Sequence, residues 1–225
     1  MISINNELQI RKIESDNFIS FLEQIECYRF HFDEGSTINI TSLRTSLKAS
    51  TIIVLYNAIE SLITQCLIKI HSEIINENLL FRNANNCIKK LIMLYYEKAV
   101  ADCNDQSKIV EYKYEFLQLT SSNEPIKISY SDLTSHYSLF SGNLDSRAIK
   151  DVLQKYGIPF DQEQSELKTI KKYRNQLAHG EKSFEEVGRE LSVQQLRVMH
   201  TKTFGYLQNV VIEVEQYINN KNYKG

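Results

Sequence analysis

The segment KTIKKYRNQLAHGEKSF places an arginine, Arg174, five positions before a histidine, His179. These residue types suit chemistry on a phosphodiester, because a guanidinium binds two phosphoryl oxygens at once and an imidazole exchanges protons near neutral pH. On a helix with about 3.6 residues per turn, the two side chains are roughly 140° apart around the axis, so they flank a shallow groove. Asn175 lies four positions before His179 and shares its face of the helix. These three residues form a candidate site.

A strip of positive charge accompanies this candidate site. Lys168, Lys171 and Lys172 precede Arg174 on the same predicted helix, in a chain with 26 lysines and arginines against 28 aspartates and glutamates. Phosphate is a natural ligand for such a strip, although the overall charge neither supports nor excludes RNA binding. At His179, the exposed carbonyl groups of the last helical turn favour an imidazolium, whereas Arg174 and Lys172 disfavour it. We therefore expect a side chain that titrates near neutrality.

The spacing alone is a weak signal. Random placement of 8 arginines and 5 histidines in 225 residues yields about 0.2 such pairs per chain. The residues by themselves leave two alternatives open: a phosphate-binding catalytic site, or a solvated helix face with a histidine near its cap.

The composition predicts that these residues are carried by an all-α protein. Only 7 glycines and 2 prolines occur in 225 residues, and the glycines separate apolar-periodic segments rather than interrupt them. We expect one domain over residues 1–225, because the chain is long enough to bury a core without disulfides or metal. The periodicity predicts a long central helix over 41–78 and peripheral helices over 8–32, 87–101, 108–119, 162–179 and 192–220. A short amphipathic helix is also predicted through Ile149, Val152, Leu153 and Tyr156, after a capping signal at Asn143 to Ser146 and before Gly157. Residues 120–131 are predicted as a loop, with a candidate strand over 126–130.

The last two predicted helices frame the candidate site. Gly180 closes the motif helix over 162–179, and Phe184 is expected to anchor the following loop to the bundle. Ser192 is a good N-cap for the final helix. Its apolar seam, at spacings of three and four, consists of Leu196, Met199, Thr203, Leu207, Val210, Val214 and Tyr217.

Other features indicate the compartment. The four cysteines, Cys27, Cys66, Cys87 and Cys103, contain no C-x-x-C pair and are expected to be reduced core residues. The start of the chain, MISINNELQIRKIE, lacks the pattern of a signal peptide, so we expect a cytoplasmic protein.

Neither a membrane nor a metal is expected. The apolar run TIIVLYNAIESLITQCLIKI is interrupted by Glu60, so it predicts a buried helix of a soluble protein. The other histidines, His31, His71, His136 and His200, have no companion residues at metal-ligand spacing, so we predict no metal and no other cofactor.

Four segments of the chain together resemble the HEPN superfamily. They are RNQLAHG, the following SFEEVG, the upstream GNLDSRAIKDVLQKYGI, and the polar interruption LYNAIES in the long helix. More narrowly, the chain is similar to the MAE-type stand-alone HEPN-like nucleases of prokaryotic toxin and defence systems. The resemblance implies an all-α bundle that forms a homodimer, with the R-x4-H helices of two copies around a shared cleft where RNA is cut without metal.

The resemblance also assigns roles to individual residues. Arg174 and His179 match the two fixed positions of the motif, and Asn175 matches the polar residue that follows the arginine. Glu60 lies where many relatives carry an acidic residue on the facing helix, although from the residues alone it belongs to the wetter face of that helix. Some relatives carry a tyrosine two positions past the histidine as the target of an antitoxin, and here that position is Glu181.

Two functions follow from this resemblance. The first is a metal-independent endoribonuclease that acts as a toxin or phage-defence effector, is controlled by an antitoxin or a second HEPN protein, and binds RNA through Lys168, Lys171 and Lys172. The second is a non-catalytic HEPN module that binds nucleotide, RNA or a partner protein.

Overall fold

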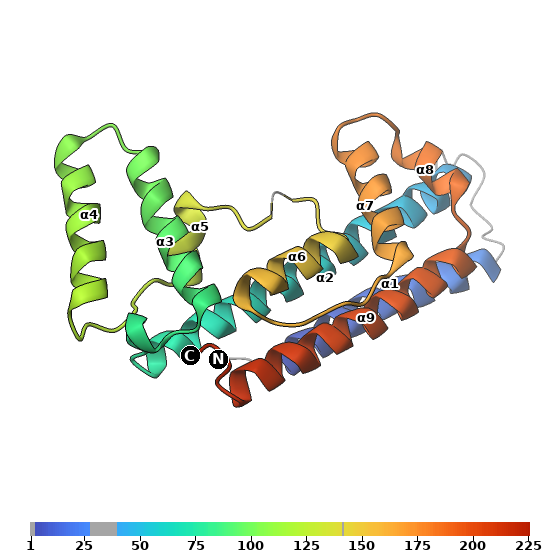
Figure 1. Ribbon diagram of the computed structural model, residues 1–225. Coiled ribbons are helices and arrows are strands. Elements are labelled where there is room, and N and C mark those ends of the chain that lie inside the picture. Colours follow the sequence, from blue (N-terminus) through green and yellow to red (C-terminus); the bar gives the residue numbers. More distant parts are fainter. Residues whose placement is uncertain (1–2, 28–39, 141) are drawn as a thin grey trace. The chain divides into compact units, whose positions relative to one another are not determined.

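The computed structural model describes residues 3–27, 40–140 and 142–225, which fold into helices without a strand (Figure 1). The all-α prediction is therefore confirmed. In chain order the helices are α1 (Ile4–Cys27), α2 (Ile40–Asn76), the short 3-10 helix η1 (Phe81–Asn83), α3 (Asn86–Ala101), α4 (Gln106–Ser121), α5 (Tyr130–His136), α6 (Ser146–Tyr156), α7 (Ser165–Ala178), α8 (Phe184–Glu190) and α9 (Val193–Asn219).

The contacts between residues divide the chain into two compact units. Unit 1 comprises Met1–Leu62, Leu144–Ser146 and Gln162–Asn209; unit 2 comprises Ile63–Asn143, Arg147–Asp161 and Val210–Gly225. The long helices α2 and α9 each contribute their first part to unit 1 and their remainder to unit 2. The expectation of a single domain over residues 1–225 stays a prediction.

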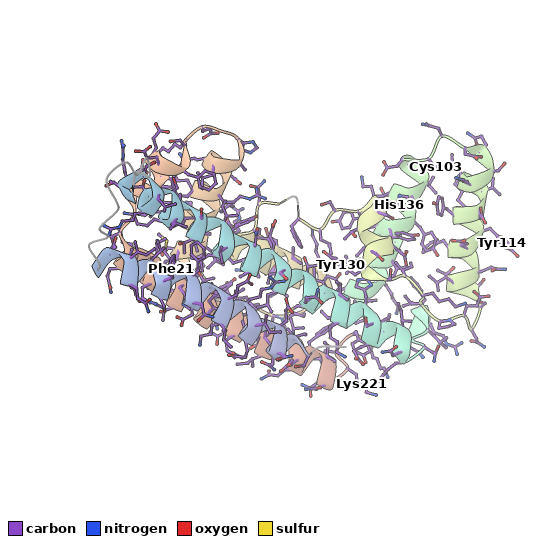
Figure 2. The ribbon with its side chains drawn as sticks, turned by 180° about the vertical axis from the view of Figure 1, so that it is seen from behind. Phe21, Cys103, Tyr114, Tyr130, His136 and Lys221 are labelled. Carbon is purple, nitrogen blue, oxygen red and sulfur yellow. The ribbon has the colours of Figure 1, made fainter. Side chains whose placement is uncertain are left out.

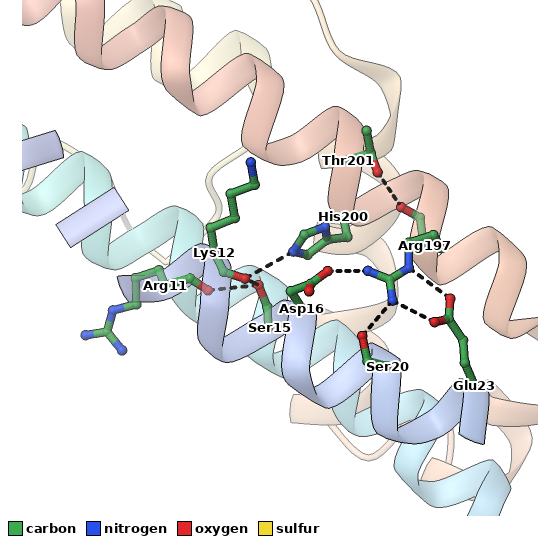
Figure 3. Close-up of polar contacts among 9 residues, drawn as sticks. All are labelled: Arg11, Lys12, Ser15, Asp16, Ser20, Glu23, Arg197, His200 and Thr201. Atoms are coloured by element: carbon green, nitrogen blue, oxygen red, sulfur yellow. Dashed lines mark hydrogen bonds and ion pairs between the residues drawn. The ribbon is translucent and has the colours of Figure 1, made fainter. Parts of the chain in front are cut away.

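In unit 1, polar contacts join α1 to the first part of α9. The guanidinium of Arg197 forms ion pairs with Asp16 and Glu23 and donates a 3.0 Å hydrogen bond to the hydroxyl of Ser20 (Figure 3). One turn further along α9, the imidazole Nε2 of His200 lies 3.3 Å from the carbonyl oxygen of Lys12. These contacts fix the register of α1 against α9.

Helix α8 packs against the beginning of α2 in unit 1. A Cβ atom added to Gly188 would lie 1.8 Å from the carbonyl oxygen of Thr45, so only glycine permits this approach. The ammonium of Lys48 also donates to the carbonyl of Leu191, at 2.8 Å. The prediction that Phe184 anchors this segment is wrong: Phe184 is the first residue of α8 and is 42% exposed.

Unit 2 contains the hairpin of α3 and α4 together with α5. The ring of His136 on α5 lies between Tyr95 of α3, at 5.6 Å, and Tyr112 of α4, at 5.8 Å, measured between ring centroids. Figure 2 labels His136 in this position and Tyr114 on the outer side of α4, where its side chain is 60% exposed.

The irregular segment before α5 is held by a buried histidine of unit 2. His71 lies 2.9 Å from the carbonyl oxygen of Ile128 through Nδ1 and 2.9 Å from the hydroxyl of Tyr156 through Nε2. Burial lowers the pKa of His71, which favours the neutral imidazole. The candidate strand over 126–130 is wrong, because these described residues form no strand: the preceding Pro125 makes an isolated bridge with Leu80, and Tyr130 already begins α5.

The other boundaries lie within a few residues of those predicted. The seam of α9 is confirmed, since all seven of its predicted members are buried. The predicted end of the first helix near Phe32 lies outside the described residues.

The cysteines only partly follow the prediction that they are core residues. Cys66 is buried as expected, whereas Cys87 and Cys103 are partly exposed, so the prediction is wrong for these two. The side chain of Cys27 is outside the described residues.

One helix of the described residues, Thr41–Asn76, is long and apolar enough to cross a membrane by length and composition, with a mean hydropathy of 1.6 over its most apolar window. Core helices of soluble proteins pass the same criterion, and 56% of that window is buried inside the protein.

Candidate functional site

Helix α7 of unit 1 carries the R-x4-H motif and ends at it. Leu167 and Ile170 are buried and attach the helix to the core. His179 is the C-cap residue, with φ −91° and ψ 0°, and its backbone N–H donates to the carbonyl of Asn175 at 2.9 Å. Gly180 follows with φ +68°, a conformation that glycine adopts readily and that terminates a helix. The predicted helix end is confirmed.

The guanidinium of Arg174 rests on an aromatic ring of α2. Its central carbon lies 4.5 Å from the centroid of the Tyr56 ring, within the range of a cation–π interaction. Its Nη1 atom donates a hydrogen bond of 3.0 Å to Oδ1 of Asn175. The arginine is thus held by one ring and one amide oxygen, and the rest of its donors are not used in a hydrogen bond to any described residue.

The ring under Arg174 is itself fixed. Tyr56 is fully buried, and its hydroxyl lies 3.2 Å from Oε1 of Glu60 and 3.0 Å from the backbone N–H of Leu144. Burial raises the pKa of Tyr56 to about 12, so the phenol is neutral at physiological pH. It therefore donates to Glu60 and accepts from Leu144.

Glu60 of α2 contacts the tyrosine that supports the arginine. Its carboxylate accepts a hydrogen bond from the Tyr56 hydroxyl, and among the described residues no ion pair joins it to Arg174. The resemblance placed this carboxylate on the helix that faces the motif. The structure connects it to Arg174 indirectly, because Glu60 bonds the hydroxyl of the tyrosine whose ring lies against the guanidinium.

The strip of lysines is divided between two environments. Lys171 forms an ion pair with Asp145, and both side chains are largely buried, at 26% and 16% exposed. Lys168 and Lys172 are exposed and form no ion pair within the described parts of the chain. Lys172 lies near enough to Glu190 to contribute, after Lys182, to lowering the pKa of that carboxyl.

His179 faces solvent at the end of α7. Its side chain is exposed, and it has no hydrogen-bond partner among the residues that the structure describes. Arg174 contacts Tyr56 of α2, whereas His179 is exposed. Within one copy of the described chain, no hydrogen bond therefore joins the two fixed residues of the motif. The arrangement provides an oriented guanidinium for an anion and an accessible imidazole for proton transfer.

Two contributors to the site were not predicted from the sequence. Tyr56 precedes Glu60 by four positions in LYNAIES, and this spacing on one helical face was an available signal. Asp145 lies in GNLDS, 26 positions before Lys171, and no periodicity connects the two residues. The segment Leu144–Ser146 thus belongs to unit 1 and supports both the ring and the motif helix.

No group of three or more histidine, cysteine, aspartate or glutamate side chains within the described ranges is arranged to hold a metal ion. The expectation that the protein works without metal stays a prediction.

Comparison with known protein families identifies a relationship of this chain. A model of a HEPN family, HEPN_MAE_28990, matches residues 2–223 of the chain. Among curated proteins and among solved structures, no match was found.

Proposed function

This chain belongs to the HEPN family, and we propose that it is a metal-independent endoribonuclease that cleaves RNA by attack of a ribose 2′-hydroxyl. The observation that carries the proposal is the fixed guanidinium of Arg174, supported by Tyr56 and Asn175, on the helix that ends at the exposed His179. The guanidinium is suited to bind a phosphate, and the imidazole is suited to transfer a proton.

In the proposed reaction, His179 removes the proton from the 2′-hydroxyl, and the resulting oxygen attacks the adjacent phosphorus. The bond from phosphorus to the 5′-oxygen breaks, and that oxygen leaves with a proton donated by His179 of a second copy. The products are a 2′,3′-cyclic phosphate and a 5′-hydroxyl end. Arg174 stabilises the charge that develops on the phosphoryl oxygens, and Asn175 orients Arg174 through Nη1.

The lysines contribute to RNA binding in different ways. Lys168 and Lys172 are exposed and bind backbone phosphates of the substrate. Lys171 adds positive charge to the same surface while it also holds Asp145. We assign the protein as a homodimeric toxin or phage-defence effector of the cytoplasm, controlled by an antitoxin or a second HEPN protein.

Variants of the motif test this function. We expect His179→Ala to cleave RNA about 10²- to 10⁴-fold more slowly than the wild-type protein, because a positioned acid or base contributes a factor of this size. Arg174→Lys should also be slow, since an ammonium does not bind two oxygens in one plane. Circular dichroism and thermal unfolding of each variant control for loss of fold. Cleavage by His179→Ala at the wild-type rate would contradict the assignment.

The nucleophile has an independent test. An oligoribonucleotide with one 2′-deoxy sugar at the scission point should resist cleavage at that position and be cut normally elsewhere. Cleavage at the deoxy position would exclude the ribose hydroxyl as the nucleophile, whatever the role of His179.

One observation favours the alternative, a non-catalytic HEPN module that binds nucleotide, RNA or a partner protein. A catalytic imidazole is commonly oriented by a third group, and His179 has no such partner among the described residues. Induced expression of wild type beside His179→Ala separates the two functions. Toxicity of the wild type alone supports the nuclease, and equal growth of both cultures supports the binding module.

A further inference from the structure

The ring of Tyr56 supports the guanidinium of Arg174 from one face, and we call this ring the platform. The guanidinium lies over the face of the ring, 4.5 Å from its centroid, and the ring is fully buried. All five N–H groups of an arginine lie in the plane of the guanidinium, so contact with a ring face uses none of them. Apart from the Nη1 contact to Asn175, no hydrogen bond to a described residue uses the donor edge, so this edge can bind a ligand.

The platform cannot rotate freely. The Tyr56 hydroxyl accepts from the N–H of Leu144 at 3.0 Å and donates to Glu60 at 3.2 Å, so the ring is fixed at its far end by one backbone and one side-chain contact. Leu144 belongs to the segment whose next residue, Asp145, is paired with Lys171 of α7. The ring and the helix that carries Arg174 therefore share a support within unit 1.

We propose that Tyr56 is a positioning residue, which holds the Arg174 guanidinium in the orientation that binds a phosphodiester, and that Glu60 acts on Arg174 through the Tyr56 hydroxyl. The phosphodiester in this statement rests on the proposed function, whereas the support of Arg174 by the ring does not. Neither the sequence pattern nor the family match assigns a role to Tyr56.

The first test separates the ring from the hydroxyl. Tyr56→Phe keeps the ring and should lower kcat for RNA cleavage by less than about 10-fold, and Tyr56→Leu removes the ring and should lower kcat by about 10²-fold, the scale of a misplaced catalytic group. KM should change less than kcat in both variants. The matched control is Phe204→Leu, which removes a buried aromatic ring of unit 1 that lies against His200 of α9.

A double-mutant cycle distinguishes positioning from a general loss of stability. If Tyr56 acts through Arg174, then Tyr56→Leu combined with Arg174→Ala should be no slower than Arg174→Ala alone. Additive losses, or equal losses in Tyr56→Leu and Phe204→Leu, would overturn the proposal.

A second measurement does not depend on activity. In arginine-labelled protein, the ring current of Tyr56 should shift the NMR signals of the Arg174 side chain, which are identified by their disappearance in Arg174→Lys. These signals should return to ordinary positions in Tyr56→Leu and stay displaced in Tyr56→Phe and Phe204→Leu. Unchanged Arg174 signals in Tyr56→Leu would contradict the proposal that the Tyr56 ring supports Arg174. A wild-type protein that cleaves no RNA but shows these shifts would refute the nuclease and leave the support of Arg174 established.

Discussion

At the scale of single residues, two of the arginines of unit 1, Arg197 and Arg174, illustrate different uses of one side chain. Arg197 contacts two carboxylates and a hydroxyl, so its donors are occupied by α1. Arg174 contacts the face of Tyr56 and one amide oxygen, so its donor edge is kept for a ligand. A guanidinium whose N–H groups all bond to protein side chains stabilises the fold. A guanidinium that rests on a ring keeps its N–H groups for a phosphate.

This contrast predicts opposite effects of similar substitutions. Arg197→Met should lower the free energy of unfolding by about 1 kcal/mol, because the partly exposed carboxylates of Asp16 and Glu23 lose a shared partner. Arg174→Met should change stability less and weaken RNA binding at the site. Chemical denaturation of both variants measures the first effect, and RNA binding measures the second. A larger stability loss for Arg174→Met than for Arg197→Met would contradict the division of roles.

A second residue-scale prediction concerns Glu77 of unit 2. Hydrogen bonds from Lys221 and Lys224, each at 2.5 Å, lower the pKa of Glu77 to about 2 (Lys221 is labelled in Figure 2). A depressed pKa means that the stabilising contribution is complete above the ordinary value of about 4.5 and is lost as the pH falls towards 2. The thermal midpoint of wild type should therefore exceed that of Glu77→Gln at pH 6. The difference should shrink between pH 4.5 and pH 2, and a constant difference would contradict the ion pairs.

At the scale of elements, two glycines in helices of unit 1 provide a matched pair. Gly188→Ala forces a Cβ against the backbone of Thr45, so it should separate α8 from α2 and destabilise the protein by about 1–3 kcal/mol. Gly205→Ala on α9 adds a Cβ that meets nothing within 4 Å, and it should stabilise by up to about 1 kcal/mol through helix propensity. The two unfolding midpoints should move in opposite directions. A shift of the same sign in both variants would contradict the close packing of α8.

The elements also show which parts of the fold are readable from the sequence. The seam of α9 and the end of α7 at Gly180 follow from periodicity and capping, which are local. Helix α8 was missed because seven residues carry less than two full turns of periodicity, although Ser183 and Glu186 form a capping box. The polar end of the chain, NNKNYKG, carries no helical periodicity, yet Tyr223 is buried and its carbonyl accepts from the backbone N–H of Asn85 across a long sequence separation. Long-range contacts of this kind, including that of Tyr56 with Arg174, leave no periodic signal.

At the scale of the whole molecule, the proposed reaction requires more than one copy of the chain. In one copy, Arg174 is directed at Tyr56 and His179 is exposed at the helix end. A single imidazole cannot be both the base that takes a proton from the 2′-hydroxyl and the acid that protonates the leaving oxygen in the same step. A two-fold dimer supplies the second imidazole, because in such a dimer the same surface of each copy faces the other.

Mixing active and inactive chains tests this requirement. Wild type is incubated with His179→Ala until subunits exchange, as verified by light scattering and by mass spectrometry of the mixed dimers. If one cleft uses a histidine from each copy, random pairing in an equal mixture should leave about half of the wild-type chains in active dimers, so that activity per wild-type chain falls about twofold. An equal amount of an unrelated protein should have no effect. Undiminished activity in verified mixed dimers would show that each copy acts alone, and the general acid would then have to be found within one chain.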